Sequence, residues 1–236
     1  MFRKILSIFL ALLLCLSLFA ALVSCGGEET PEGPEEDPDE GFDPDALNPD
    51  KYVSDSGSFP DSSVTWTYYE SGRLVIGGTG DMGDCIYKAN GESDTDQPFG
   101  RHLKYIYKIE IAEGVTSLSE NTFKLCTNIK EIKIPSTITE IPFACFEGCT
   151  KLETVEAPSV TTIGENAFAG CSSLESITLS ETLQEVDLGA FFTGNDALSV
   201  TYYGTEAAWQ ALLAGGVHKT GNDVLKNATV SYDTQD

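Results

Sequence analysis

Aliphatic residues recur along the middle of the chain in clusters of three, each with the spacing i, i+3 and i+5. The first residues of successive clusters, beginning at Ile106, lie 23, 23 and 22 residues apart. Three further apolar columns keep the same step, and phenylalanine fills the last of them in every unit. Such a unit cannot bury its apolar side alone and must stack on its neighbours. The pattern therefore predicts four stacked coils of 22–23 residues over residues 103–196. The clusters are Ile106, Ile109 and Ile111; Ile129, Ile132 and Ile134; Leu152, Val155 and Ala157; and Leu174, Ile177 and Leu179, and the phenylalanines are Phe123, Phe146, Phe168 and Phe191.

A period in the low twenties, with one short apolar strand and a return segment, is typical of a leucine-rich repeat solenoid. Its short parallel β-strands stack in coils with little helix, and its terminal units must cover the core. We expect residues 51–102 to form an N-terminal β-rich cap with a hairpin at 64–69 and 73–76. Residues 197–236 are expected to form a C-terminal cap of helix and strand. There Thr205 caps the helix and Trp209 covers the last coil.

Several segments resemble one particular group of leucine-rich repeats. Inside the repeats these are Lys133–Ile138, Ala144–Cys149 and Thr162–Leu174; outside them they are Trp66–Thr67, Ser71–Ile76, Gly78–Met82, Tyr202–Trp209 and Asn227–Val230. Together they make residues 60–232 similar to the BspA-type leucine-rich repeat family of bacterial surface proteins. Pro98–Phe99 departs from that pattern, where Pro-Trp usually stands. The resemblance implies a solenoid fold and adhesion to host or microbial surfaces.

The first 24 residues are typical of a secretion signal. Arg3 and Lys4 precede an apolar run from Ile5 to Val23, and this layout marks a segment removed from the mature protein. The run is nearly long enough to span a bilayer, so an uncleaved anchor is the alternative. The sequence Leu-Val-Ser-Cys at 22–25 resembles the lipobox of bacterial lipoproteins, which implies cleavage before Cys25 and lipidation of its thiol. We therefore expect a secreted lipoprotein held at the outside of the bacterial membrane or envelope, in a leaflet that the sequence does not specify.

Residues 25–50 are expected to be a disordered tether. Positions 26–50 hold eleven acidic residues and five prolines but no Lys or Arg. A segment of this composition buries too little apolar surface to offset the entropy that it would lose on ordering. The whole chain has 37 acidic against 14 basic residues, a net charge of -23. Because this charge repels phosphate backbones, nucleic acid is excluded as a partner.

Residues typical of catalysis are sparse. The two histidines, His102 and His218, lie at opposite edges of the repeats, so neither suggests a pairing with a Ser or Cys nucleophile. Loop carboxylates of the N-terminal cap offer oxygen ligands for Ca²⁺, although without the spacing of an EF-hand. These are Asp81, Asp84, Asp94 and Asp96. The sequence predicts no enzymatic activity, no cofactor and no metal; a hydrolase that uses the loop carboxylates is the less favoured alternative.

Five cysteines remain if Cys15 is removed with the signal and Cys25 is lipidated. They are Cys85, Cys126, Cys145, Cys149 and Cys171. Three of them occupy one repeat column, three residues after the phenylalanine. Their place in the repeat register favours small buried apolar side chains over a metal cluster. Coils stacked ~4.8 Å apart would also permit a disulfide between column neighbours.

Alternation along each predicted strand turns the residues between the aliphatic positions outward. These residues are Lys108, Glu110, Glu131, Lys133, Thr154, Glu156, Ser176 and Thr178. The surface is polar, of mixed charge and without an aromatic row, which favours weak or multivalent contact over a deep pocket. We predict that it binds a protein or glycan outside the cell and that the chain is a monomer. The alternative is a structural scaffold or spacer of the envelope that has no ligand of its own.

Overall fold

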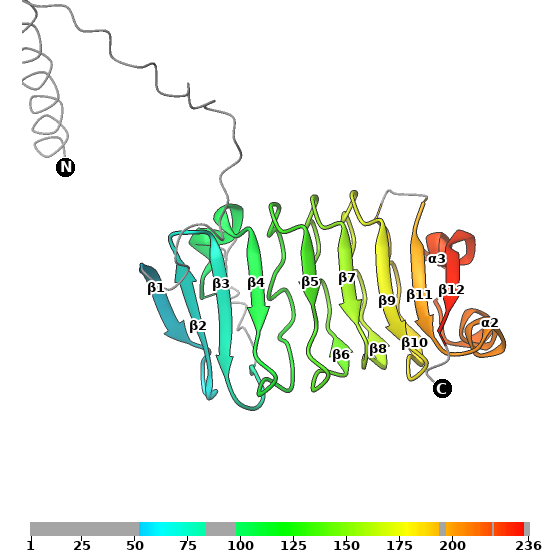
Figure 1. Ribbon diagram of the computed structural model, residues 1–236, viewed down its shortest axis with the longest axis horizontal. Helices are drawn as coiled ribbons and strands as arrows, with labels where there is room; N and C mark the ends of the chain where they lie inside the picture. Colours follow the sequence, from blue (N-terminus) through cyan, green and yellow to red (C-terminus); the bar gives the residue numbers. More distant parts are fainter. Residues whose placement is uncertain (1–51, 84–97, 194–196, 219, 234–236) are drawn as a thin grey trace, which may run out of the picture. The chain divides into compact units, whose positions relative to one another are not determined.

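The computed structural model describes residues 52–83, 98–193, 197–218 and 220–233. All of them belong to one compact unit, residues 43–236. In this unit short strands lie side by side in successive coils, as Figure 1 shows. The predicted signal segment, the lipidated Cys25, the tether, Cys85 and three of the four loop aspartates lie outside the described residues.

The N-terminal cap supplies the first three strands of a four-stranded sheet, and the strand of the first repeat completes it, in the order β1-β2-β3-β4. Their bounds are Val53–Ser58 for β1, Val64–Tyr69 for β2, Arg73–Gly78 for β3 and Lys108–Ile111 for β4. The first three strands are antiparallel, and β3 pairs with β4 in parallel. Gly72 makes the β2–β3 turn with φ of +81°, a conformation that glycine adopts without steric cost. A 3₁₀ helix, η2 (Gly100–Tyr105), precedes β4. The predicted hairpin is confirmed, and β1 extends it by one strand.

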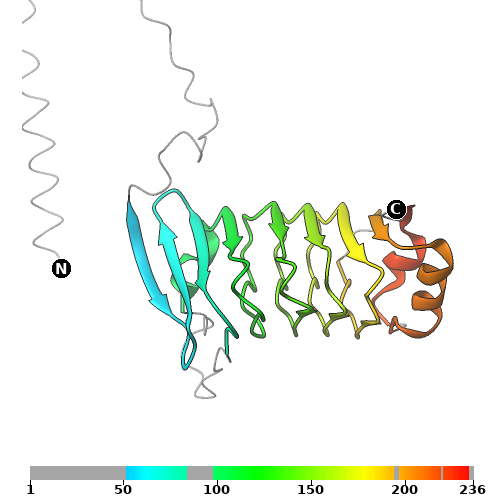
Figure 2. The same cartoon turned by 60° about the horizontal axis from the view of Figure 1, so that its bottom comes forward.

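A second sheet carries the repeats in the order β12-β11-β9-β7-β5. Its strands are β5 (Glu131–Lys133), β7 (Thr154–Ala157), β9 (Ser176–Ser180), β11 (Ser199–Tyr203) and β12 (Thr229–Tyr232). All pairs are parallel, and Ile132, Val155, Ile177 and Val200 lie in one row across the strands. The return segments form a third sheet of β6 (Glu140–Ile141), β8 (Thr162–Ile163) and β10 (Glu185–Val186), which Figure 2 shows at the other side of the coils. The predicted solenoid is confirmed.

Stacked phenylalanine rings run through the core along the axis of the coils. Phe123, Phe146, Phe168 and Phe191 are all buried, and their ring centroids are 5.4, 5.4 and 5.3 Å apart. Phe99 of the N-terminal cap continues the row at 6.1 Å from Phe123. Rings at these separations attract each other in addition to the area they bury. The predicted phenylalanine column is therefore a continuous stack that joins the cap to the repeats.

The C-terminal cap closes the last coil with two helices and β12. The helix α2 (Glu206–Gly215) begins after Thr205, whose Oγ1 accepts a hydrogen bond from the Ala208 N–H at 3.2 Å. Trp209 is buried, with its ring 5.2 Å from that of Tyr202 on β11. Both cap predictions are confirmed.

A buried side chain amide ties this cap to the final coil. Asn222 precedes the short helix α3 (Asp223–Asn227) and is completely buried. Its Oδ1 accepts from the Phe191 N–H at 2.9 Å, and its Nδ2 donates to the carbonyls of Asp187 at 2.7 Å and His218 at 2.9 Å. Asn222 therefore forms hydrogen bonds with backbone groups of the final coil that, in the middle of the solenoid, would pair with a following coil.

Four described cysteines are buried thiols: Cys126, Cys145, Cys149 and Cys171. The Sγ of Cys149 donates to the carbonyl of Phe123, and that of Cys171 to the carbonyl of Phe146, each at 3.2 Å. Burial raises the pKa of the Cys126 thiol and of the Cys149 thiol, and it raises the pKa of Cys171 to about 12. The column is thus a row of small core side chains, as the repeat register predicted.

These thiols should resist alkylation in the folded protein. The test uses residues 43–236 with the substitution Cys85→Ser, treated with iodoacetamide at pH 8. We expect the four thiols of the folded protein to be labelled at least ~1,000-fold more slowly than those of the protein unfolded in guanidinium chloride, because the reaction requires opening of the core. Mass spectrometry of timed samples measures the labelling. Rapid labelling of any of the four without denaturant would contradict the packing described above.

Candidate functional site

The outward-facing residues of the parallel strands form one continuous surface, here called the strand face. Strand pairing places Glu131, Thr154, Ser176 and Ser199 in one row and Lys133, Glu156, Thr178 and Thr201 in the next. Lys108 and Glu110 hold the matching positions on β4, next to Arg73 and Val75 of β3. The structure therefore brings all eight candidate binding residues together on this face.

The strand face has a charged part and an uncharged part. Over β3, β4, β5 and β7 it carries ion pairs from Arg73 to Glu110 at 2.7 Å, from Lys108 to Glu110 at 3.4 Å and from Lys133 to Glu156 at 3.5 Å. Over β9 and β11 the same rows hold only hydroxyl side chains, those of Ser176, Thr178, Ser199 and Thr201. The Lys108–Glu110 and Lys133–Glu156 pairs are exposed and add little to stability, so a ligand can rearrange them at small cost, whereas the Arg73 side chain is only 19% exposed.

Arg73 sets the electrostatics at the N-terminal side of the strand face. Its Nε and Nη2 donate to Glu110 Oε2 at 2.9 and 2.7 Å. These hydrogen bonds, with the charges of Arg73 and Lys108, hold the pKa of the Glu110 carboxyl below its ordinary value. Glu110 thus remains ionised under mildly acidic conditions.

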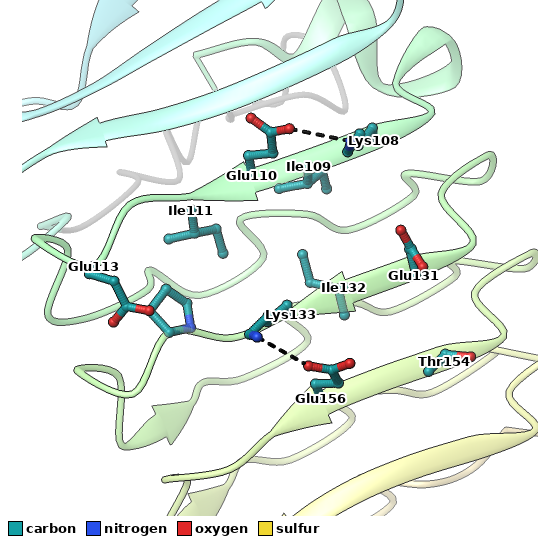
Figure 3. Close-up of a pocket in the computed structure, with 11 residues that line it drawn as sticks. Lys108, Ile109, Glu110, Ile111, Glu113, Glu131, Ile132, Lys133, Thr154 and Glu156 are labelled. Atoms are coloured by element: carbon teal, nitrogen blue, oxygen red, sulfur yellow. Dashed lines mark ion pairs between the residues drawn. The ribbon is translucent and has the colours of Figure 1, made fainter. Parts of the chain in front are cut away.

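A pocket of about 310 Å³ opens on the charged part of the strand face, between β4, β5 and β7 (Figure 3). Apolar side chains contribute to its lining, among them Ile109, Ile111, Ile132 and Pro135, and charged groups stand around them. Six of the eight candidate residues line it: Lys108, Glu110, Glu131, Lys133, Thr154 and Glu156. Ser176 and Thr178 lie on the same face but do not line the pocket. Sequence reasoning did not assign the other lining residues to a site; these are Ile109, Ile111, Glu113, Ile132 and Pro135.

The pocket coincides with a break between two sheets, here called the seam. β4 is the last strand of the first sheet, and β5 is the first strand of the second. Ile111 is only half-buried at the seam, whereas the residues that match it in the next three repeats are buried. The aliphatic spacing predicts one uninterrupted row of strands through the repeats, and the seam is the exception.

One histidine has a carboxylate partner in the N-terminal cap. The Nε2 of His102 is 2.9 Å from Asp55 Oδ2, Arg101 also donates to this carboxylate, and the His102 ring stacks on Tyr68 at 4.1 Å. Hydrogen bonds from His102 first, and then from Arg101, lower the pKa of the Asp55 carboxyl. The cluster links β1 to η2, and the stacked imidazole has the role of a structural contact.

Asp81 and His218, the remaining candidates among the described residues, do not line the pocket. Asp81 accepts hydrogen bonds from the Gly83 N–H at 2.6 Å and from Ser117 Oγ at 2.7 Å, and these two bonds lower its carboxyl pKa. His218 Nδ1 accepts from the Thr220 N–H at 3.2 Å in the opposite cap. Across the described ranges, no group of three His, Cys, Asp or Glu side chains is placed to hold a metal ion. Within the same ranges, no helix has the length and apolar character needed to cross a membrane.

Comparison with solved structures finds other bacterial leucine-rich repeat proteins. A leucine-rich repeat protein from Eubacterium ventriosum is 22% identical with a TM-score of 0.45, over 62% of this chain and 44% of that one. A leucine rich cell surface protein from Faecalibacterium prausnitzii is 23% identical with a TM-score of 0.45, over 63% of this chain and 40% of that one. A leucine-rich repeat protein from T. pallidum is 21% identical with a TM-score of 0.38, over 61% of this chain and 71% of that one. The match thus spans less than half the length of the first two proteins.

No curated protein matches the chain. A family model, in contrast, matches residues 99–205 in six copies, and its description is a BspA type leucine rich repeat region. The matched residues run from the end of the N-terminal cap through the stacked coils to the start of α2. Residues 99–205 of this chain therefore belong to the BspA-type leucine-rich repeat family.

Proposed function

We propose that this chain is a lipid-anchored bacterial surface protein whose strand face binds a protein or a glycan outside the cell, without catalysing a reaction. The observation that carries the proposal is the pocket on the charged part of the strand face. Charged side chains stand around partly apolar walls there, on strands that the buried phenylalanine stack holds in register. A rigid surface of this kind loses little conformational entropy on binding.

The proposed anchor rests on the N-terminal sequence. An apolar run ends in Leu-Val-Ser-Cys, and an acidic, proline-rich segment follows it. Two or more acyl chains on Cys25 would hold the protein at the membrane, because a single chain binds only marginally. Metabolic labelling with radioactive palmitate tests this directly, since the label should enter the wild-type chain and be absent from Cys25→Ser.

The composition of the face indicates how it would select a partner. Ionic groups at the rim of an interface mainly steer encounter and discriminate between partners, whereas desolvated groups at the centre supply most of the affinity. In this chain the half-buried Ile111 supplies apolar surface at the pocket wall, and Lys133 and Glu156 stand beside it. Binding should therefore weaken as the salt concentration rises.

Loss of one ion pair on the strand face should weaken this binding measurably. We expect Lys133→Ser with Glu156→Ser to weaken the binding of residues 43–236 to host-matrix proteins or to a glycan array by about tenfold, or about 1.4 kcal/mol. The matched control is Lys124→Ser with Glu147→Ser. It also removes one ion pair, of 2.9 Å, leaves the net charge unchanged and lies outside the pocket lining.

Both double variants should unfold within about 0.5 kcal/mol of the wild type, because surface ion pairs contribute little. Equal loss of binding in both would show non-specific charge attraction. If the wild type binds nothing saturably, the chain is a scaffold without its own ligand and the proposal is wrong.

A further inference from the structure

Two exposed tyrosines stand where the N-terminal cap meets the first coil. Tyr105 is the last residue of η2 and Tyr107 directly precedes β4, and their side chains are 50% and 52% exposed. Ile106 between them is buried and has extended backbone, so both tyrosine rings point outward on the same side of the chain. Single exposed apolar residues are ordinary on a protein surface, whereas neighbouring ones indicate a binding surface.

The β2–β3 turn fixes the backbone that carries the two rings. The Tyr107 N–H donates to the Gly72 carbonyl at 2.8 Å, and the Tyr68 hydroxyl donates to the Tyr105 carbonyl at 3.4 Å. The Tyr107 ring lies directly on Gly72, where an added Cβ atom would be 2.6 Å from Cδ2 of the ring. Tyrosine offers a large and rigid contact surface and loses little conformational entropy on binding.

Polar side chains of three successive coils lie beside the rings. The Nζ of Lys104 stands over the Tyr105 ring, 5.0 Å from its centroid. The Asn128 Nδ2 donates to the Lys104 carbonyl at 2.7 Å, and the Asn128 Oδ1 accepts from the Lys151 Nζ at 2.8 Å. We call the residues Lys104, Tyr105, Tyr107, Asn128 and Lys151 the loop edge. None of these five lines the pocket on the strand face.

The loop edge keeps charge and hydrogen-bonding capacity for a ligand. Toward the rest of the described chain, the Asn128 amide uses one of its two donors and one of its two acceptor sites. In the part of the chain that the structure describes, neither Lys104 nor Lys151 pairs with a carboxylate. Two positive charges and an amide therefore stand next to two flat aromatic rings.

The distribution of charge along the chain favours an anionic ligand at this end. Residues 98–151 hold seven Lys and Arg against six Asp and Glu, whereas residues 152–236 hold two against twelve. The field of the C-terminal coils consequently repels an anion, and the field around the loop edge does not.

We infer that the loop edge binds an acidic polysaccharide, which makes it a ligand site additional to the strand face. One face of a pyranose ring consists of C–H groups, and these are attracted to the electron-rich faces of Tyr105 and Tyr107. The carboxylate or sulfate groups of the sugar contact Lys104 and Lys151, and its hydroxyl groups hydrogen-bond to the Asn128 amide. An acidic peptide would satisfy the two lysines but would leave the flat rings without a matching surface.

The first test measures the binding of residues 43–236 to immobilised polygalacturonate, hyaluronan and chondroitin sulfate by biolayer interferometry. We expect saturable binding to at least one of them, weakened at least about fivefold by Tyr105→Ser and by Tyr107→Ser, because buried tyrosines supply much of the affinity of an interface. Both side chains are exposed in the free protein, so the variants should fold. Tyr232→Ser is the matched control, since it removes an exposed tyrosine from β12. It should leave binding unchanged.

The second test removes the charges. Lys104→Ser with Lys151→Ser should weaken the binding at least about tenfold at low ionic strength and should make it less sensitive to added salt. Lys124→Ser with Lys226→Ser is the matched control. It changes the net charge by the same amount, but each of these lysines already pairs with a carboxylate. Equal losses in the two double variants would show general charge attraction and would overturn the inference.

Dextran and poly-L-glutamate separate the other possible ligands. The uncharged dextran and the acidic polypeptide should each bind at least about tenfold more weakly than the acidic polysaccharide. Equal binding of dextran would show that charge does not matter, and equal binding of poly-L-glutamate would assign the loop edge to acidic polypeptides. Either result overturns the inference, as does the absence of saturable binding to all three acidic polysaccharides.

The strand face is tested independently of the loop edge. Lys133→Ser with Glu156→Ser should leave the binding of the acidic polysaccharide unchanged. If this variant loses the binding while Tyr105→Ser and Tyr107→Ser keep it, the polysaccharide binds the strand face and the inference is wrong, although the proposed function stands. If the polysaccharide binds as described here but no ligand depends on Lys133 and Glu156, the loop edge stands and the proposed function of the strand face fails.

Discussion

Replacing Phe146 by Ala should lower the free energy of unfolding by about 3–5 kcal/mol. The Phe146 side chain is completely buried, and its ring lies 5.4 Å from both Phe123 and Phe168. The cavity would open in the middle of the stack, where coils on both sides lose contacts and neither can collapse into the space without breaking its register. Guanidinium denaturation of residues 43–236, followed by far-UV circular dichroism, measures the change.

Phe192→Ala is the matched control for this prediction. Phe192 follows directly after a member of the stack, but its side chain is 70% exposed. The same chemical change there should alter stability by no more than about 0.5 kcal/mol. A loss below about 1 kcal/mol for Phe146→Ala, or equal losses for the two variants, would show that the stack does not support the coils.

Trp209→Ala should also cost about 3–5 kcal/mol, but its damage should concentrate at the C-terminal end. Trp209 is 1% exposed and packs on Tyr202, so its removal uncovers the last coil to water. In a solenoid each unit depends on its neighbours, and loss of a cap lets the terminal strands open first. Hydrogen exchange should therefore accelerate most at Val200 and Tyr202 on β11.

Gln210→Ala provides the control on the same helix, since Gln210 is exposed. It should change neither stability beyond about 0.5 kcal/mol nor exchange on β11. Uniform acceleration of exchange along all the coils in Trp209→Ala would contradict a local capping role and would indicate a single cooperative unit.

The repeat register made the interior predictable. A residue that recurs at the same place in four units faces the same environment in each of them, so Phe146 and Cys149 were assigned to the core without knowledge of any contact. The same alternation placed Lys133 and Glu156 on the outer surface. The helix cap at Thr205 followed from local sequence alone, because capping depends on residues three positions apart.

Features that depend on one particular pair of distant segments could not be predicted. The cluster at Ile106, Ile109 and Ile111 has the same spacing as the other three, so nothing in it marks the seam beside β4. Asn222 binds three backbone groups, those of Asp187, Phe191 and His218, through contacts that span up to 35 residues. Asp55 and His102 meet across 47 residues for the same reason. Only the folded chain brings these groups together.

The stacked core has a consequence for how such a chain can change in length. Each coil offers the same phenylalanine, aliphatic and small side chains to the neighbour before it and to the one after it. Ser176 already occupies on β9 the position that Thr154 occupies on β7. Excision of residues 154–175 would therefore place the coil of β9 in the position that the coil of β7 now occupies. The strand face would become shorter by one strand. The seam and both caps would stay intact. Duplication of a coil would lengthen the face in the same way, so the size of the strand face can vary in whole units while its ends remain unchanged.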